Sequence, residues 1–188
     1  MDKNGILVLL TKVFFVIALI ALIFFGFKSK NDENRKTFGR KIDGDLYIFT
    51  HEPLLNIGNK SLDLEVLGIS QADLAYFKSP PGYFFTDYPQ NPPFDRSDWN
   101  IIHWNTTPVD TRYEELVSFA LDTLFSPLLS ESSAYSISRY FSLMNGYLQE
   151  EGNYYSIRYK MKDDNLKSAH LFIVAPEHKN IFRLKKGN

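Results

Sequence analysis

One long apolar run dominates the N-terminal part of this 188-residue chain. It covers residues 5–27, GILVLLTKVFFVIALIALIFFGF, and 17 of its 23 residues are Leu, Ile, Val or Phe. As a helix it would extend about 34 Å at about 1.5 Å per residue, enough to cross a hydrocarbon core of about 30 Å. Each apolar side chain favours insertion by about 0.3–0.6 kcal/mol, against a cost of at most about 3 kcal/mol for Lys12. The run therefore predicts a transmembrane helix, and the rest of the chain must be read as a tethered domain.

A cleaved signal peptide is the alternative interpretation of this run, with Lys3 and Lys12 as its charged region and residues 13–27 as its apolar region. The sequence that follows has no small-x-small cleavage pattern, which favours an uncleaved signal anchor that crosses the membrane once. This layout is typical of exported proteins, so we expect the domain outside the cytoplasm, in the periplasm or the extracellular space. The excess of Lys and Arg in residues 28–41 favours the opposite orientation.

Three segments are expected along the chain. Residues 1–27 form the membrane anchor. Residues 28–41, KSKNDENRKTFGRK, are polar and charged and predict a juxtamembrane linker, an ordinary solvated flank with lipid head-group contact as the alternative. Residues 42–188 are long enough to bury about two-thirds of their unfolded surface around one core, which predicts one globular domain.

Charge is unevenly distributed within that domain. Residues 42–157 contain 5 Lys and Arg against 16 Asp and Glu, whereas residues 158–188 contain 8 against 3. The asymmetry is compatible with a basic contact surface, but pairing between the two parts is the simpler explanation. Because the C-terminal basic residues alternate with apolar ones, we expect most of them on an exposed face of a sheet.

Periodicity predicts two helices and then three strands in the second half of the chain. Thr111 and Glu114 match a capping box that opens a helix, which ends at Ser126 and Pro127. A second helix is expected at 133–148, and the short connection predicts a helical hairpin. The period then changes to two, which predicts an antiparallel meander formed by YYSIRYKMK, HLFIVA and IFRLKK.

The first half of the chain is less regular. A short helix is expected in residues 69–77, with Ser70 as its N-cap and Asp73 in its first turn. The predicted strands are 45–50, 61–67, 82–86 and 99–104. The predicted fold class is therefore α+β, with an antiparallel sheet packed on one face against the helical hairpin.

Proline and aromatic residues are interleaved in residues 79–95, SPPGYFFTDYPQNPPFD. Proline lowers the entropy that an ordered loop loses on folding, and exposed aromatic side chains dominate the energy of many interfaces. Tyr83, Phe85 and Tyr88 are therefore candidates for binding a protein partner. Packing of these rings into the core is the alternative, and it is favoured by the general burial of aromatic residues.

Motifs for catalysis and cofactor binding are missing from the sequence. The chain has no cysteine, no P-loop, no G-x-S-x-G and no G-x-G-x-x-G. Asp95, Asp98 and His103 come nearest to an acid–base or metal cluster, but their spacing matches no established ligand pattern. We therefore predict no cofactor, no metal and no nucleic-acid ligand.

Two functions are compatible with these patterns. The favoured one is a membrane-anchored accessory or interaction protein, which contacts lipid through residues 5–27 and binds a protein partner through a domain outside the cytoplasm. The alternative is a membrane-tethered enzyme, for example a hydrolase, that uses Asp95, Asp98 and His103. Side chains that converge in a concave pocket would favour the enzyme.

Overall fold

The computed structural model describes residues 3–39, 48–57, 60–91, 99–122 and 131–187. Its six strands form an antiparallel sheet in the order β1-β2-β6-β5-β4-β3. The strands are β1 (Ile48–Ile57), β2 (Lys60–Gly68), β3 (Asn100–Thr106), β4 (Tyr154–Lys162), β5 (Asn165–Ala175) and β6 (Asn180–Gly187). The helices are α1 (Lys3–Phe38), α2 (Gln71–Lys78), α3 (Gly82–Asp87), the 3-10 turn η1 (Thr111–Tyr113), α4 (Glu114–Leu121) and α5 (Glu131–Gln149). The predicted α+β class with an antiparallel sheet is confirmed.

The predicted C-terminal meander is also confirmed. β4, β5 and β6 follow one another in the chain and pair as neighbours, with Ile157 opposite Leu171 and Leu171 opposite Leu184. Asp163 and Asp164 form the β4–β5 turn with φ angles of 50° and 59°. Two consecutive positive φ angles are typical of a type I′ hairpin turn, in which aspartate is tolerated. The acidic turn therefore helps to set the register of the hairpin.

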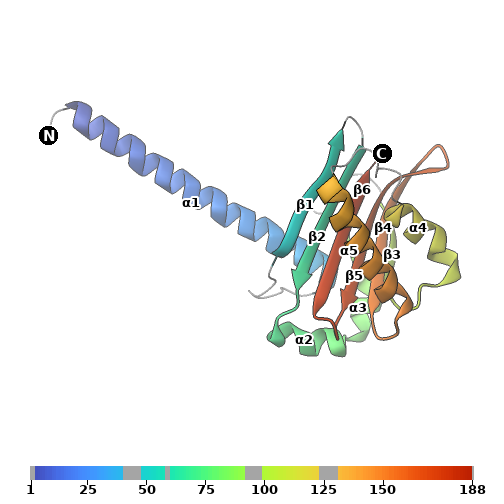
Figure 1. Ribbon diagram of the computed structural model, residues 1–188. Coiled ribbons are helices and arrows are strands. Elements are labelled where there is room, and N and C mark those ends of the chain that lie inside the picture. Colours follow the sequence, from blue (N-terminus) through green and yellow to red (C-terminus); the bar gives the residue numbers. More distant parts are fainter. Residues whose placement is uncertain (1–2, 40–47, 58–59, 92–98, 123–130, 188) are drawn as a thin grey trace.

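One face of the sheet, here called the first face, is covered by α4 and α5 (Figure 1). Alternate residues of β5, Leu171 and Ile173, are fully buried there. They share a core with Ala120 of α4 and with Met144 and Leu148 of α5. The sequence therefore predicted correctly that two helices cover one face of the sheet.

The start of this helical layer differs from the prediction. The carboxylate of Asp110, not the hydroxyl of Thr111, caps the first turn, and it accepts a hydrogen bond from the N–H of Arg112 at 2.9 Å. That turn is a 3-10 turn, and α4 begins at Glu114. The connection to α5, residues 123–130, lies outside the described residues.

The opposite or second face is covered as well, which the sequence analysis did not predict. Phe172 and Val174 of β5 point to this side and belong to a second core. That core includes Phe38 at the end of α1, Phe77 of α2 and Phe84 of α3. The sheet therefore lies between two helical layers.

Two short segments of the second layer test the local predictions. The helix predicted with Ser70 as its cap is confirmed as α2, because the Ser70 hydroxyl accepts the N–H of Asp73 at 3.1 Å. The strand predicted for 82–86 is wrong, because these residues form α3. In this helical turn Phe84 is buried and its neighbour Tyr83 is 47% exposed. A strand would also separate two neighbouring rings in this way, so such a short sequence does not distinguish a helix from a strand.

α1 is one continuous helix of 36 residues, about 54 Å long at about 1.5 Å per residue. Figure 1 shows it projecting well beyond the sheet at its N-terminal end. It continues through most of the predicted linker at 28–41 and ends at Phe38. Over the residues that the structure describes, no helix has both the length and the hydropathy that a membrane span requires.

The expectation that the C-terminal basic residues lie on an exposed face is wrong for three of them. Arg158 is 1% exposed, and Arg183 and Lys186 are each 3% exposed. Arg158 and Arg183 lie on the second face, next to α1. For these two arginines the alternation was read correctly, but a layer of helices covers the face that was predicted to be in water. Lys186 lies on the first face, where its Nζ donates to the carbonyl of Phe119 in α4.

Candidate functional site

The C-terminal end of α1 is held in a polar and aromatic site on the second face of the sheet. Asn34, Thr37 and Phe38 of α1 are 4%, 0% and 0% exposed. We call the surrounding residues the α1 socket. They are Glu65, Tyr76, Phe77, Phe84, Tyr88, Gln90, Trp104, Arg158, Phe172 and Arg183.

The socket satisfies the last carbonyl groups of α1, which a helix cannot pair by itself. The indole Nε1–H of Trp104 donates to the carbonyl of Thr37 at 2.9 Å, and the hydroxyl of Tyr76 donates to the carbonyl of Phe38 at 2.7 Å. The N–H of Gln90 donates to the carbonyl of Lys36 at 2.7 Å. Three donors that are far away in the sequence therefore recognise the end of this helix.

Gly39 completes the cap and brings α1 against Tyr88. Its N–H donates to the carbonyl of Arg35 at 2.9 Å, and its φ of +78° is the left-handed conformation that ends many helices. A Cβ at this position would lie 2.6 Å from Cε2 of Tyr88. Both the φ angle and the close approach therefore require glycine.

The ring of Phe38 fills the centre of the socket. It stacks on Trp104 with ring centroids 5.7 Å apart and meets Phe77 edge to face, also at 5.7 Å. The guanidinium of Arg183 lies over the same ring at 5.3 Å. Full burial of a phenylalanine side chain contributes about 1.5–3 kcal/mol from the hydrophobic effect, before any aromatic contact is counted.

Arg183 of β6 joins α1 to the neighbouring strand β2. Its Nη1 donates to Oε2 of Glu65 at 3.1 Å, and its Nη2 donates to Oδ1 of Asn34 on α1. The carboxylate of Glu65 compensates the buried positive charge, and the amide oxygen of Asn34 accepts a second hydrogen bond from the guanidinium. Arg183 therefore makes the position of α1 depend on a residue of β2.

Arg158 is a buried guanidinium of a different kind. Its Nη2 donates to Oγ1 of Thr37 at 3.5 Å, without a carboxylate partner in the described part of the chain, and its Nε, like that of Arg183, has no acceptor there. Burial lowers the pKa of Arg158 to about 10, partly opposed by the negative charge of Glu33. The ring of Phe172 at 5.1 Å and the negative end of the α1 dipole are favourable for this cation.

Of the three predicted binding residues, Tyr88 belongs to this socket, and Tyr83 and Phe85 are its neighbours in α3. Tyr83 is 47% exposed and touches Tyr88 edge to face at 6.2 Å. Phe85 is partly buried against Tyr154 at 5.7 Å. Tyr88 is partly buried, and its carbonyl accepts the N–H of Trp104 at 3.1 Å. Phe85 and Tyr88 thus pack within the domain, and Tyr83 presents the most open of the three rings.

Of the three residues in the alternative enzyme hypothesis, the structure describes His103. Asp95 and Asp98 lie outside the described residues. His103 is exposed on β3, and its Nδ1 lies 3.0 Å from the carbonyl oxygen of Tyr88. Within the described ranges, no group of His, Cys, Asp or Glu side chains is arranged to hold a metal ion.

Sequence reasoning missed the whole α1 socket. Its best signal was the sequence Thr37-Phe38-Gly39, an apolar ring followed by a helix-ending glycine inside a charged segment. The donors Tyr76 and Trp104 are dispersed along the chain, so their convergence leaves no local pattern. Comparison with protein-family models, with curated proteins and with solved structures finds no match to this chain.

Proposed function

We propose that the protein is a single-pass membrane protein whose domain binds a protein partner and is attached rigidly to its anchor. The observation that carries this proposal is the α1 socket. The helix that contains the apolar run at 5–27 also supplies Phe38 to the domain core. A chain that needed only a flexible tether would have no use for a capped and buried helix end.

The described side chains of α1 support contact with lipid. Between residues 13 and 22, eight large apolar side chains are each 47–70% exposed. Residues 13–17 alone point in all directions around the axis, since successive side chains are about 100° apart. A helix that is apolar all round is stable in a bilayer and unstable in water. Within the apolar run, the described side chains are those of residues 11–22, about 18 Å of helix, and the proposal of a full span is based on the sequence.

The rigid attachment implies that the domain lies close to the bilayer. If the hydrocarbon core ends near Phe27, Glu33 follows after about 9 Å of helix. Glu33 already contacts the domain, since its Oε1 lies 3.7 Å from Nζ of Lys185. We place the domain outside the cytoplasm because of the basic N-terminus and the single apolar run.

Carbonate extraction and N-terminal sequencing test the anchor. We expect the protein to stay in the membrane pellet at alkaline pH and to keep its N-terminus. Release into the supernatant, or a new N-terminus near residue 28, would contradict the anchor. A reporter that is active only after export, fused behind Asn188, tests the orientation, and an inactive but stable fusion would reverse it.

A tyrosine pair tests the binding function. Tyr83 and Tyr135 are both exposed, at 47% and 75%, and only Tyr83 belongs to the predicted contact region. We expect Tyr83→Ala to reduce partner recovery from solubilised membranes by about tenfold or more, as loss of an aromatic hot spot does. Tyr135→Ala is the control and should leave recovery unchanged. Equal recovery from both variants would remove Tyr83 from the interface.

A further inference from the structure

We propose that the surface around α4 docks a basic amphipathic segment of a partner protein in the same membrane. This inference rests on the proposed membrane anchor. It concerns the first face of the sheet, opposite to the layer that contains Tyr83. We call this surface the α4 face, and it consists of α4 with the hollow on either side of it.

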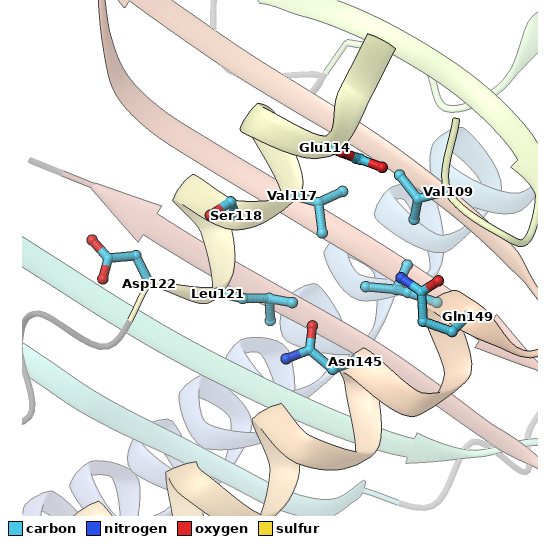
Figure 2. Close-up of a pocket in the computed structure, with 9 residues that line it drawn as sticks. Val109, Glu114, Val117, Ser118, Leu121, Asp122, Asn145 and Gln149 are labelled. Atoms are coloured by element: carbon cyan, nitrogen blue, oxygen red, sulfur yellow. The ribbon is translucent and has the colours of Figure 1, made fainter. Parts of the chain in front are cut away.

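The first hollow lies between α4 and α5 and has a volume of about 380 Å³ (Figure 2). Its apolar part is formed by Val109, Val117, Leu121 and Leu148. Figure 2 shows Val117 and Leu121 pointing from α4 towards the Asn145 side of α5. A hollow of this size accepts one or two large side chains of a partner.

The second hollow lies on the other side of α4, over the β4–β5 hairpin, and has a volume of about 680 Å³. Leu116, Tyr159, Met161 and Leu166 form its apolar part. Met161 is 46% exposed, and methionine is common on surfaces that adapt to partners. The exposed side chain of Ser118 lines both hollows, so a single helix turn separates them.

The charge of the α4 face is negative. Glu114, Glu115, Asp122 and Asp164 line the two hollows, and no Lys, Arg or His is among their described lining residues. Asp122 is approached by Nζ of Lys186 at 3.7 Å. The other three carboxylates form no ion pair within the described part of the chain. Strand alternation has placed Arg158 and Lys160 on the opposite face.

These features specify the chemistry of the occupant. Each hollow combines several apolar side chains with a mainly polar and acidic exposed lining. Such a surface complements a segment that carries apolar anchors next to Lys or Arg, as an amphipathic basic helix does. An acidic segment would place like charges next to the carboxylates of this face. A uniformly polar segment would leave the hollows without apolar side chains to fill them. The partner segment is therefore basic on one side and apolar on the other.

The α1 socket determines where the α4 face points. α1 contacts Arg183 on β6 through Asn34, Arg158 on β4 through Thr37 and Trp104 on β3 through Phe38. The C-terminal end of α1 therefore runs across the strands, with its axis parallel to the plane of the sheet. If α1 is tilted by about 20° from the bilayer normal, the average for membrane helices, both faces of the sheet are directed roughly parallel to the membrane plane. The α4 face then meets neighbours in the same bilayer.

Photocrosslinking in native membranes tests this inference. A benzophenone amino acid is placed in the full chain at Ser118, which lines both hollows, or at Ser142, an exposed α5 residue that lines neither. We expect a discrete protein adduct from position 118, at least about fivefold stronger than from 142, as a specific interface requires. Its crosslinked segment should belong to an integral membrane protein and contain Lys or Arg beside apolar residues.

Charge variants sharpen the result. The isosteric double variant Glu115→Gln, Asp164→Asn should weaken the adduct by about fivefold or more, and Glu150→Gln, Glu151→Gln, on exposed residues outside the hollows, should leave it unchanged. An absent adduct, equal adducts from 118 and 142, a partner segment without basic residues, or insensitivity to the charge change would each overturn the inference. Carbonate extraction of the same membranes shows separately whether the anchor itself has failed.

Discussion

The two faces of the sheet bury their helices by different chemistry. On the first face the core with α4 and α5 is largely aliphatic, and Lys186 is its buried cation. On the second face Phe38 and Trp104 lie among two buried arginines and several directed hydrogen bonds. Aliphatic packing is non-directional and tolerates small shifts of a helix. Directed polar contacts define one position, which fits a helix whose orientation is transmitted to the domain.

The largest effect is expected from Phe38→Ala, which empties the centre of the α1 socket. Truncation of a buried phenylalanine costs about 3–5 kcal/mol in the free energy of unfolding. Urea unfolding of the detergent-solubilised full chain measures it. Leu143→Ala, on a residue that is 37% exposed on α5, is the control and should change stability by less than about 0.5 kcal/mol. Similar stabilities of the two variants would show that α1 is not held by its end.

The two buried arginines should respond oppositely to replacement by methionine. Arg183→Met breaks the ion pair between Arg183 and the partly buried carboxylate of Glu65 and should cost about 3 kcal/mol. Arg158→Met removes a buried charge that no carboxylate contacts in the described part of the chain, so stability should be unchanged or higher by about 1 kcal/mol. Urea midpoints compare them. Equal losses would mean that Arg158 is needed to hold the end of α1.

Alanine variants at two glycines distinguish the cost of a positive φ angle from the cost of a steric contact. Gly39 and Gly152 both have positive φ, +78° and +87°, but only Gly39 would place a Cβ against a neighbour, the ring of Tyr88. We expect Gly152→Ala to cost about 1 kcal/mol and Gly39→Ala about 1 kcal/mol more. Thermal unfolding of both variants gives the difference. Equal losses would show that Tyr88 moves aside freely.

The smallest effect concerns pH and Lys186 on the first face. Burial lowers the pKa of Lys186, although its Nζ donates to the carbonyl of Phe119 at 2.7 Å. A lysine with a lowered pKa binds its proton more weakly in the folded state than in the unfolded state, so it favours folding more as pH rises towards the usual lysine range. The stability of the protein relative to Lys186→Met should therefore increase between neutral and alkaline pH. A flat difference in urea midpoints would contradict the burial of this charge.

Local signals were sufficient where neighbours in the sequence decide the structure. Ser70 and Asp73 cap α2 within one turn, and the alternation around Ile157 predicts β4. Residues 82–86 were misread because five residues with two apolar rings satisfy a helix turn and a strand alike. Arg158 and Arg183 were expected in water because alternation shows which residues share a face and does not show what covers that face.

The sequence by itself determined the elements with strong periodicity: the apolar helix, the helices over the first face and the C-terminal meander. It also determined that Ile157 and Arg158 lie on opposite sides of β4, since that follows from the two-residue repeat of a strand. Only the tertiary structure decided that α1 ends inside the domain, because its caps come from Tyr76, Gln90 and Trp104, which are at least 38 residues away. Contacts between residues so far apart in the sequence depend on how the helical layers pack on the sheet, and the periodicity of a segment does not predict that packing.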